Sequence, residues 1–192
     1  ALEPSFAWRE GRLVTERSAA HVRGFDLPVG PRQGVSVGGT EHLSLPRWAP
    51  QLERVGVFVG WTGPLSRPTQ VLSLGTAALA QVPPLAAAMA AAAARVLPGS
   101  SGGPTPEHRA AARSVVVAEA FDDQGERLAT ATVEGPSPYD LTAELLAWGA
   151  DVSLTGGLQA TGALGPVEAF GLDGLETGCA SLGLGVSELT AG

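Results

Sequence analysis

The chain contains no lysine, no isoleucine and no asparagine, and all 12 of its basic residues are arginine. The codons of the three missing residues are rich in A and T, which indicates a bacterial genome rich in G and C. Acidic residues number 19, so the formal net charge is −7. No arginine cluster offsets this charge locally, and a nucleic-acid partner needs a basic footprint. We therefore expect no nucleic-acid partner.

Cysteine and aromatic residues are also scarce. A single cysteine, Cys179, excludes an internal disulfide and lacks the partners of a zinc site. His21 and His108 have no suitably spaced ligands beside them, so we expect no metal. Aromatic residues make up only 5% of the chain, so alanine, valine and leucine must fill the core. A length of 192 residues suits one domain over residues 1–192.

Long apolar runs are absent as well. No run reaches the roughly 18 residues that a membrane-spanning helix needs, and the alanine-rich stretch 85–94 is too short. The chain has no signal-like start. These absences predict a cytoplasmic protein with no membrane partner. No Gly-x-Gly-x-x-Gly occurs either, so we expect no dinucleotide cofactor to bind this chain.

The turn residues and the spacing of apolar residues along the chain predict a mixture of strands and helices. Alternating residues around tight turns predict two hairpins, Phe6–Thr15 and Ser114–Val133. Arg54–Trp61 is the clearest strand, and since both faces are nearly free of charge, we expect it to be central and covered. Weaker patterns favour strands over 20–25 and 34–37. Helices are predicted over 72–79, 85–97, 138–150 and 172–182.

Residues at the helix ends support two of these helices. Ser137 can cap the helix that begins with Pro138, and Gly183 is a plausible stop for the last one. The order of the elements is not a regular strand–helix alternation. The sequence therefore predicts an α+β fold with a mostly antiparallel mixed sheet and helices packed on one face.

One candidate site lies in Gly38-Gly39-Thr40-Glu41-His42-Leu43-Ser44-Leu45-Pro46-Arg47. The glycines permit a sharp turn or a close approach to a ligand. A carboxylate (Glu41), an imidazole (His42) and a guanidinium (Arg47) are suited to orienting an acidic or amino-acid-like substrate, and His42 can move a proton near neutral pH. The simpler alternative is a short helical turn that Pro46 ends, with Arg47 solvated.

A second candidate is the segment Gly60–Arg67, which follows the predicted central strand. Loops at strand ends often carry function. Trp61 and Arg67 are suited to stacking on a ligand and to binding an anion. The alternative is a core tryptophan and a solvated arginine.

A third candidate is Val133-Glu134-Gly135-Pro136-Ser137-Pro138-Tyr139-Asp140-Leu141-Thr142, which leads from a hairpin into a helix. An exposed helix N-terminus can hold an anion, and Tyr139 can donate a hydrogen bond to it. The alternative is a capped helix start with a purely structural role.

The most distinctive segment is Gly162-Ala163-Leu164-Gly165-Pro166-Val167-Glu168-Ala169-Phe170-Gly171-Leu172-Asp173. Together with Gly38–Arg47 and Val133–Thr142, in this order, it resembles the C-terminal half of saccharopine-dehydrogenase-like oxidoreductases. The resemblance covers about residues 5–185. It implies a domain that binds a small-molecule substrate and assembles as a homodimer.

The resemblance also implies a nucleotide-binding domain, in cis or in trans, that brings NAD(P). It places Gly39, Glu41, His42 and Arg47 near the interdomain cleft, with Tyr139 as a further substrate-binding residue, and identifies no catalytic residue. Apolar residues of the last segment and the helix after it would pack against the nucleotide-binding domain. On this reading the chain is inactive alone. The alternative is a stand-alone ligand-binding or assembly protein that has lost the cofactor domain.

Overall fold

The computed structural model describes residues 5–60, 63–80, 84, 87–88, 91 and 103–191. The chain divides into two compact units, residues 1–101 and 102–192, which are described one at a time. The expectation of one domain over 1–192 stays a prediction.

The first unit begins with an antiparallel hairpin of β1 (Ser5–Arg9) and β2 (Arg12–Glu16), as predicted. Glu10 and Gly11 form its turn, and their positive φ angles of 52° and 70° match the twist of a tight hairpin. The Arg9 guanidinium joins the strands, because Nη2 lies 3.2 Å from Glu16 Oε1. The same side chain donates to the Val55 carbonyl at 2.9 Å, which ties the hairpin to the rest of the unit.

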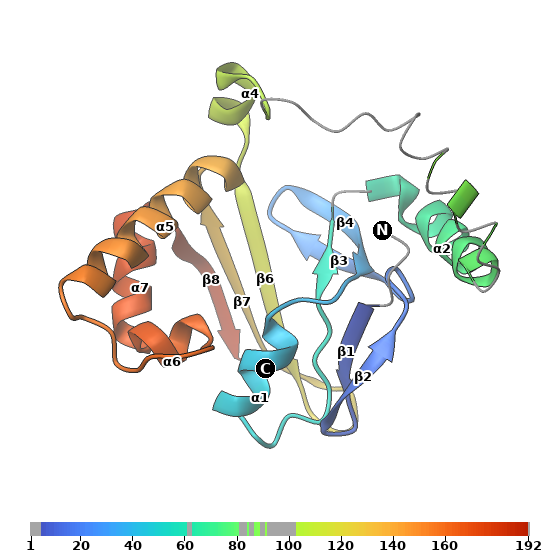
Figure 1. The fold of residues 1–192 in the computed structure, drawn as a ribbon, viewed down its shortest axis with the longest axis horizontal. Helices are drawn as coiled ribbons and strands as arrows, with labels where there is room; N and C mark the ends of the chain where they lie inside the picture. Colours follow the sequence, from blue (N-terminus) through green and yellow to red (C-terminus); the bar gives the residue numbers. More distant parts are fainter. Residues whose placement is uncertain are drawn as a thin grey trace. The chain divides into compact units, whose positions relative to one another are not determined.

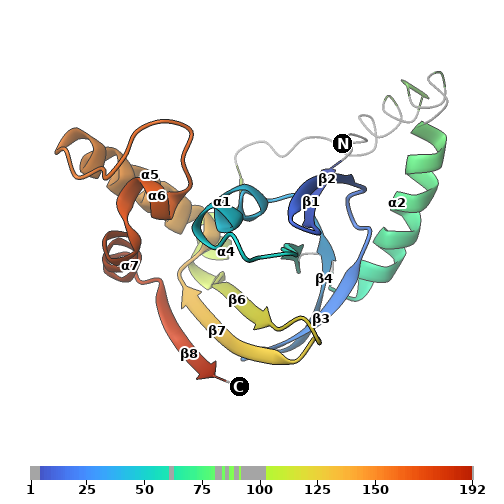
Figure 2. The same ribbon diagram turned by 90° about the horizontal axis from the view of Figure 1, so that it is seen from below.

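The second sheet of the first unit has the antiparallel order β3-β4-β5, from β3 (Val22–Leu27), β4 (Gly30–Ser36) and β5 (Phe58–Val59). Helix α1 (Glu41–Trp48) follows β4, and the 3-10 helix η1 (Gly63–Leu65) leads into α2 (Ser66–Ala80). Helix α2 lies beside β3 and β4 in both ribbon views (Figure 1 and Figure 2). Its Gln70 Nε2 donates to the Ala20 carbonyl at 2.7 Å, which fixes the helix to the start of β3.

The segment Arg54–Trp61 differs from the predicted central strand. Only Phe58 and Val59 form β5, and β5 lies at an edge of its sheet. Val55 instead bridges Trp8 of the hairpin, where its N–H donates to the Trp8 carbonyl at 3.1 Å. The chain therefore crosses from one sheet to the other between Val55 and Phe58, which leaves only two residues to pair with β4. Trp61 lies outside the described residues.

The second unit contains one antiparallel sheet of order β6-β7-β8, from β6 (Ser114–Phe121), β7 (Arg127–Gly135) and β8 (Gly185–Ala191). The Asp122 carboxylate shapes the β6–β7 turn, since Oδ1 accepts from the N–H groups of Gln124 and Glu126 at 2.9 and 2.8 Å. Strand β8 carries a bulge. Thr132 and Val133 are consecutive in β7, but their partners are Glu188 and Val186, so Ser187 is an extra residue.

The helices of the second unit are α4 (Pro106–Ala111), α5 (Pro138–Leu154), α6 (Pro166–Phe170) and α7 (Leu172–Ser181). Helices α5, α6 and α7 lie side by side (Figure 1). The ring centroid of Trp148, in α5, lies 4.8 Å from that of Phe170, in α6. Helix α7 approaches α5 closely because Gly178 faces the Trp148 indole, and any Cβ there would collide with the ring. Gly183, with φ of 78°, follows the end of α7 as predicted.

The α+β class is confirmed, with antiparallel strands throughout the described residues. The strands divide among three separate sheets. Both predicted hairpins and the helices that begin at Pro138 and Leu172 are present, whereas α4, α6 and β8 were not predicted. The predicted helix 85–97 lies largely outside the described residues. None of the helices in the described part of the chain has the length and apolarity needed to cross a membrane.

Candidate functional site

The predicted site at Gly38–Arg47 forms the turn into α1. The Gly38 N–H donates to Ser5 Oγ at 2.8 Å, and a Cβ on Gly38 would come within 3.2 Å of the Phe6 ring. His42 is 1% exposed, and its Nδ1 lies 3.1 Å from both the nitrogen and the carbonyl oxygen of Gly39. Its ring also meets the Phe6 ring edge-on, with centroids 5.7 Å apart. His42 therefore holds the turn together from inside.

The structure does not bring His42, Glu41 and Arg47 onto one open surface. His42, Pro46 and Ala49 form the buried side of α1, whereas Glu41 and Arg47 are exposed. The reason is the helical period, because positions four and seven residues after His42 share its side and Arg47 does not. Pro46 lies inside the helix and does not end it. The substrate-binding role of Gly39, Glu41, His42 and Arg47 stays a prediction.

Tyr139 belongs to the second unit, at the start of α5, and 61% of it is exposed. Ser137 occupies the N-cap position without a side-chain capping bond, and within the described residues its buried Oγ has no hydrogen-bond partner. Arg109 Nε lies 3.6 Å from Asp140 Oδ1 and anchors α4 to this end of α5. The helix begins at Pro138 as predicted, but the predicted cap by the Ser137 side chain is not formed, and Tyr139 is exposed to solvent. Its role as a substrate-binding residue stays a prediction.

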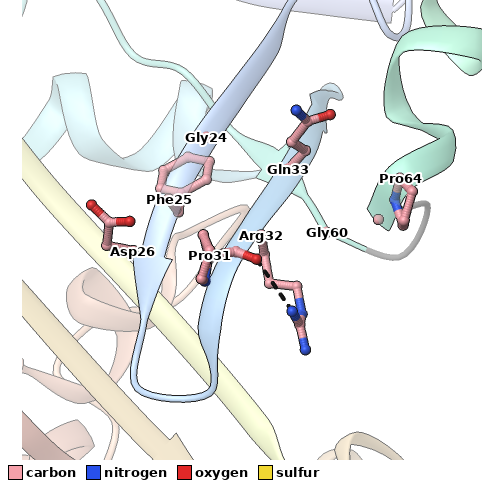
Figure 3. Close-up of a pocket in the computed structure, with 9 residues that line it drawn as sticks. Gly24, Phe25, Asp26, Pro31, Arg32, Gln33, Gly60 and Pro64 are labelled. Carbon is pink, nitrogen blue, oxygen red and sulfur yellow. Dashed lines mark hydrogen bonds between the residues drawn. The ribbon is translucent and has the colours of Figure 1, made fainter.

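The first unit has an open groove that none of these five residues lines. Its volume of about 830 Å³ is within the range of ligand-binding sites. The groove opens where β5 stops pairing with β4, since β5 pairs only with Val35 and Ser36. Figure 3 shows Arg32 and Gln33 extending from β4, and Asp26 extending from β3 on the other side of the hairpin. The lining residues are Gly24, Phe25, Asp26, Pro31, Arg32, Gln33, Gly60, Gly63 and Pro64.

Neighbouring side chains hold the aromatic wall of this groove in place. The Phe25 ring meets Phe58 at 5.6 Å between centroids, and the Arg23 guanidinium lies 5.1 Å from the Phe25 centroid. Phe25 and Arg32 are paired across β3 and β4, so both project from the same face of the sheet. An aromatic ring beside a guanidinium is suited to an anionic ligand with an apolar body.

The polar groups of the groove differ in how many of their hydrogen-bonding positions are already used. Arg32 Nη1 donates to the Pro31 carbonyl at 3.2 Å, and this single bond leaves most of its five N–H donors available. The Gln33 carbonyl accepts from Ser66 Oγ at 3.2 Å, and Ser66 is completely buried at the start of α2. The backbone of β4 is therefore fixed at the groove, while the Arg32 side chain extends into solvent.

The second unit has a smaller groove, of about 420 Å³, between α5 and α7. Trp148, Phe170 and Gly178 are among its lining residues. Cys179 follows Gly178, and burial raises the pKa of its thiol, which makes it a poor nucleophile. Within the described residues, no three His, Cys, Asp or Glu side chains come together in a way that could hold a metal ion.

Sequence reasoning found only part of the first-unit groove. The segment Gly60–Arg67 was a candidate, and it supplies Gly60, Gly63 and Pro64. The larger part comes from the hairpin of β3 and β4, where no motif marks Phe25 or Arg32. The available signal was the pair of oppositely charged residues, Asp26 and Arg32, on either side of the Pro28-Val29 turn.

Comparison with known proteins finds no matching family model, no matching curated protein and no matching solved structure.

Proposed function

We propose that the chain binds a small carboxylate as the substrate-binding part of a saccharopine-dehydrogenase-like, NAD(P)-dependent oxidoreductase, and that the first-unit groove is the binding site. The observation that carries the proposal is the pairing of Phe25 and Arg32 across the strands that line the groove. The guanidinium binds the carboxylate, and the ring of Phe25 packs against an apolar part of the ligand. The oxidoreductase part of the proposal rests on the three motifs that resemble saccharopine-dehydrogenase-like proteins.

The described residues do not fit NAD(P). A dinucleotide site needs a parallel strand–helix–strand unit with a glycine-rich turn at the helix N-terminus. All strand pairs in the described residues are antiparallel, and the sequence has no glycine fingerprint. In the proposal, a separate nucleotide-binding domain brings the hydride carrier, the protein is cytoplasmic, and this chain is inactive alone and assembles as a homodimer.

A second candidate function is a stand-alone ligand-binding or assembly protein. The same observation favours it, because a groove without a dinucleotide fold can serve binding alone. The two candidates differ in the gene. The oxidoreductase predicts that the reading frame extends upstream of Ala1 into a glycine-rich strand–helix–strand unit, or that a separate subunit supplies that unit.

The groove is tested by NMR titration of the isotope-labelled chain with 4-phenylbutyrate, a carboxylate with an apolar body. We expect the amide signals of Gly24, Gln33 and Gly63 to shift. Arg32→Gln should weaken binding at least about tenfold, since a charge-assisted hydrogen bond contributes roughly 1.5–3 kcal/mol. Arg12→Gln is the matched control, because Arg12 is an exposed arginine on β2 of the same unit and does not line the groove.

Two outcomes contradict the groove as the binding site. One is a set of shifts that leaves the groove amides unchanged. The other is equal weakening by Arg32→Gln and Arg12→Gln, which would indicate non-specific attraction to arginine. In a separate titration with NADPH, we expect no saturable binding, and binding in the low micromolar range would contradict the assignment of the cofactor to another domain.

A further inference from the structure

The groove between α5 and α7 of the second unit has an aromatic wall. Trp148 comes from α5 and Phe170 from α6, and their ring centroids lie 4.8 Å apart. Both residues are half-buried and line the groove, so part of each ring is open to it. Val152, one turn after Trp148 on α5, extends the apolar side. An aromatic ring attracts a cation, because its face carries partial negative charge.

The α7 side of the same groove carries a row of side-chain oxygens. Asp173, Thr177 and Ser181 recur every four residues along one side of the helix, and all three line the groove. Ser181 Oγ donates to the Gly178 carbonyl at 2.7 Å, which leaves its lone pairs available to accept. Asp173 is exposed, and within the described residues its carboxylate forms no ion pair or hydrogen bond. This side of the groove therefore offers acceptors to a ligand that carries donors.

Two glycines beside this row leave room for a ligand. Gly178 is covered by the Trp148 indole, and a Cβ there would collide with the ring. Gly174, one turn earlier, also lines the groove, but nothing lies within 4 Å of the position that its Cβ would take. The unfilled part of the groove is therefore next to Asp173, one turn away from the indole.

The charge of the surrounding chain is entirely negative. No arginine, lysine or histidine follows Arg127, whereas residues 128–192 contain eight acidic residues. These are Glu134, Asp140, Glu144, Asp151, Glu168, Asp173, Glu176 and Glu188. Helix α5 also ends beside the groove, its last turn has no basic residue, and the C-terminal end of a helix carries partial negative charge. The local field therefore attracts a cation and repels an anion.

We infer that this groove binds a small organic cation, in which a primary ammonium group is attached to an apolar body. The Asp173 carboxylate and the Thr177 hydroxyl accept the N–H groups of the ammonium, while the apolar body packs against Trp148 and Phe170. A volume of about 420 Å³ suits a ligand of this size. The site lies within the second unit alone, and it does not depend on the carboxylate site proposed for the first unit.

The test is an NMR titration of the isotope-labelled whole chain with benzylamine, which is an ammonium ion at neutral pH. We expect saturable shifts of the Gly174 and Gly178 amides and of the Trp148 indole N–H. Phenylacetate carries the same benzyl group with a negative charge, and it should bind at least about tenfold more weakly. Added salt should weaken the binding of benzylamine, since it screens exposed charges.

A pair of variants locates the charge that matters. Asp173→Asn should raise the dissociation constant for benzylamine about three- to tenfold, because it removes a charge-assisted hydrogen bond at a solvent-exposed position. Glu176→Gln is the matched control, since it removes the same charge from an exposed position of α7 that does not line the groove. It should change the dissociation constant by less than about 1.5-fold. Thermal melts that match the wild type show that a loss of binding is not a loss of folding.

Three outcomes overturn the inference. One is a set of shifts that leaves Gly174 and Gly178 unchanged, which would place the ligand elsewhere. Another is equal binding of benzylamine and phenylacetate by the wild type, because the groove would then select only the apolar body. The third is equal weakening by Asp173→Asn and Glu176→Gln, which would indicate general attraction of a cation to an acidic unit. All three are independent of the result of the 4-phenylbutyrate titration.

Discussion

The two three-stranded sheets of this protein divide their polar and apolar side chains in different ways. In the sheet of β3, β4 and β5, both faces mix the two kinds. Phe25 lies beside Arg32 on one face, while Asp26 and Gln33 lie with Val35 on the other. In the sheet of β6, β7 and β8, the face that carries Val116, Val133 and Leu189, which we call the outer face, is apolar except for Ser114 at one end, and the opposite face is largely polar.

This difference bears on what each sheet is suited to bind. Mixed side chains around an open strand edge offer a small ligand both a charge and an apolar wall. A uniform apolar face offers no group that recognises a small polar ligand, but it suits another flat apolar surface. The alternation of residues along the strands is the same in both sheets, so the side-chain types alone make the distinction. The predictions below test how the two units are stabilised.

The largest expected effect is in the first unit, at His42. His42→Ala removes a fully buried ring that contacts Phe6 and bonds the Gly39 backbone, and should lower the free energy of unfolding by about 2–4 kcal/mol. Glu41→Ala, at the neighbouring exposed position, should change it by less than about 0.5 kcal/mol. Chemical denaturation measures both. Equal small effects would mean that His42 is not the internal support of the α1 turn.

In the second unit, the corresponding support is the helix contact at Gly178. Gly178→Ala forces a Cβ into the Trp148 indole and should destabilise the protein by about 1–3 kcal/mol. Gly174→Ala is the matched control on α7, since nothing lies within 4 Å of a Cβ there. Because alanine has a higher helix propensity than glycine, Gly174→Ala should raise the free energy of unfolding by roughly 0.5–1 kcal/mol. In thermal melts, a lower melting temperature for Gly178→Ala and a higher one for Gly174→Ala would show that the contact between α5 and α7 stabilises this unit. A change of both melting temperatures in the same direction would contradict the prediction.

The same substitution in the two sheets compares them directly. Val35→Thr introduces a hydroxyl at a position 7% exposed and should cost about 1–2 kcal/mol. Val116→Thr, at a position 56% exposed on the outer face, should cost the monomer less than about 0.5 kcal/mol. The measurement is urea denaturation of both variants. A large cost for Val116→Thr would show that the outer face is covered within the monomer.

The smallest expected effect is a pH dependence of α4. The pKa of Glu107 is lowered by its hydrogen bond to the backbone and by the Thr105 hydroxyl. A lowered pKa stabilises the folded form above the ordinary carboxyl pKa, and this contribution is lost as the pH falls through the lowered value. Amide exchange in α4 should therefore accelerate in acid beyond the change seen in α5, and Glu107→Gln should abolish the difference. A pH-independent ratio of the two exchange rates would contradict the prediction.

Much of the fold is predictable from local sequence, because hairpins and helix ends carry their own signals. The turns at Glu10-Gly11 and Asp122–Gln124 define both hairpins, and Pro138 and Gly183 delimit helices. The strand at Arg54–Trp61 was wrong for a non-local reason. Its valines alternate as in one long strand, but Trp8 holds Val55 in a different sheet.

The candidate site was less predictable than the fold. The first-unit groove depends on which residues of β3 and β4 face each other and on where β5 ends, and both follow from pairing between distant segments. The crowding of ionisable residues near Gly39 predicts a site, and this stays a prediction; the sequence pattern did not show that the helical period turns His42 inward and leaves Glu41 and Arg47 exposed. The outer face was not predicted either, because it depends on the pairing of β7 with the distant strand β8, and β8 was not predicted.

The bulge at Ser187 explains why β8 escaped detection. Val186 and Leu189 are three positions apart, an odd spacing that would put them on opposite faces of a regular strand. Ser187 resets the phase, so both reach the outer face. Ser187 is therefore the one extra residue that shifts the alternation of inward and outward side chains along β8. Deleting one residue usually inverts every side chain beyond it, but deleting Ser187 would leave each remaining pair of β7 and β8 in register, joined by an uninterrupted ladder.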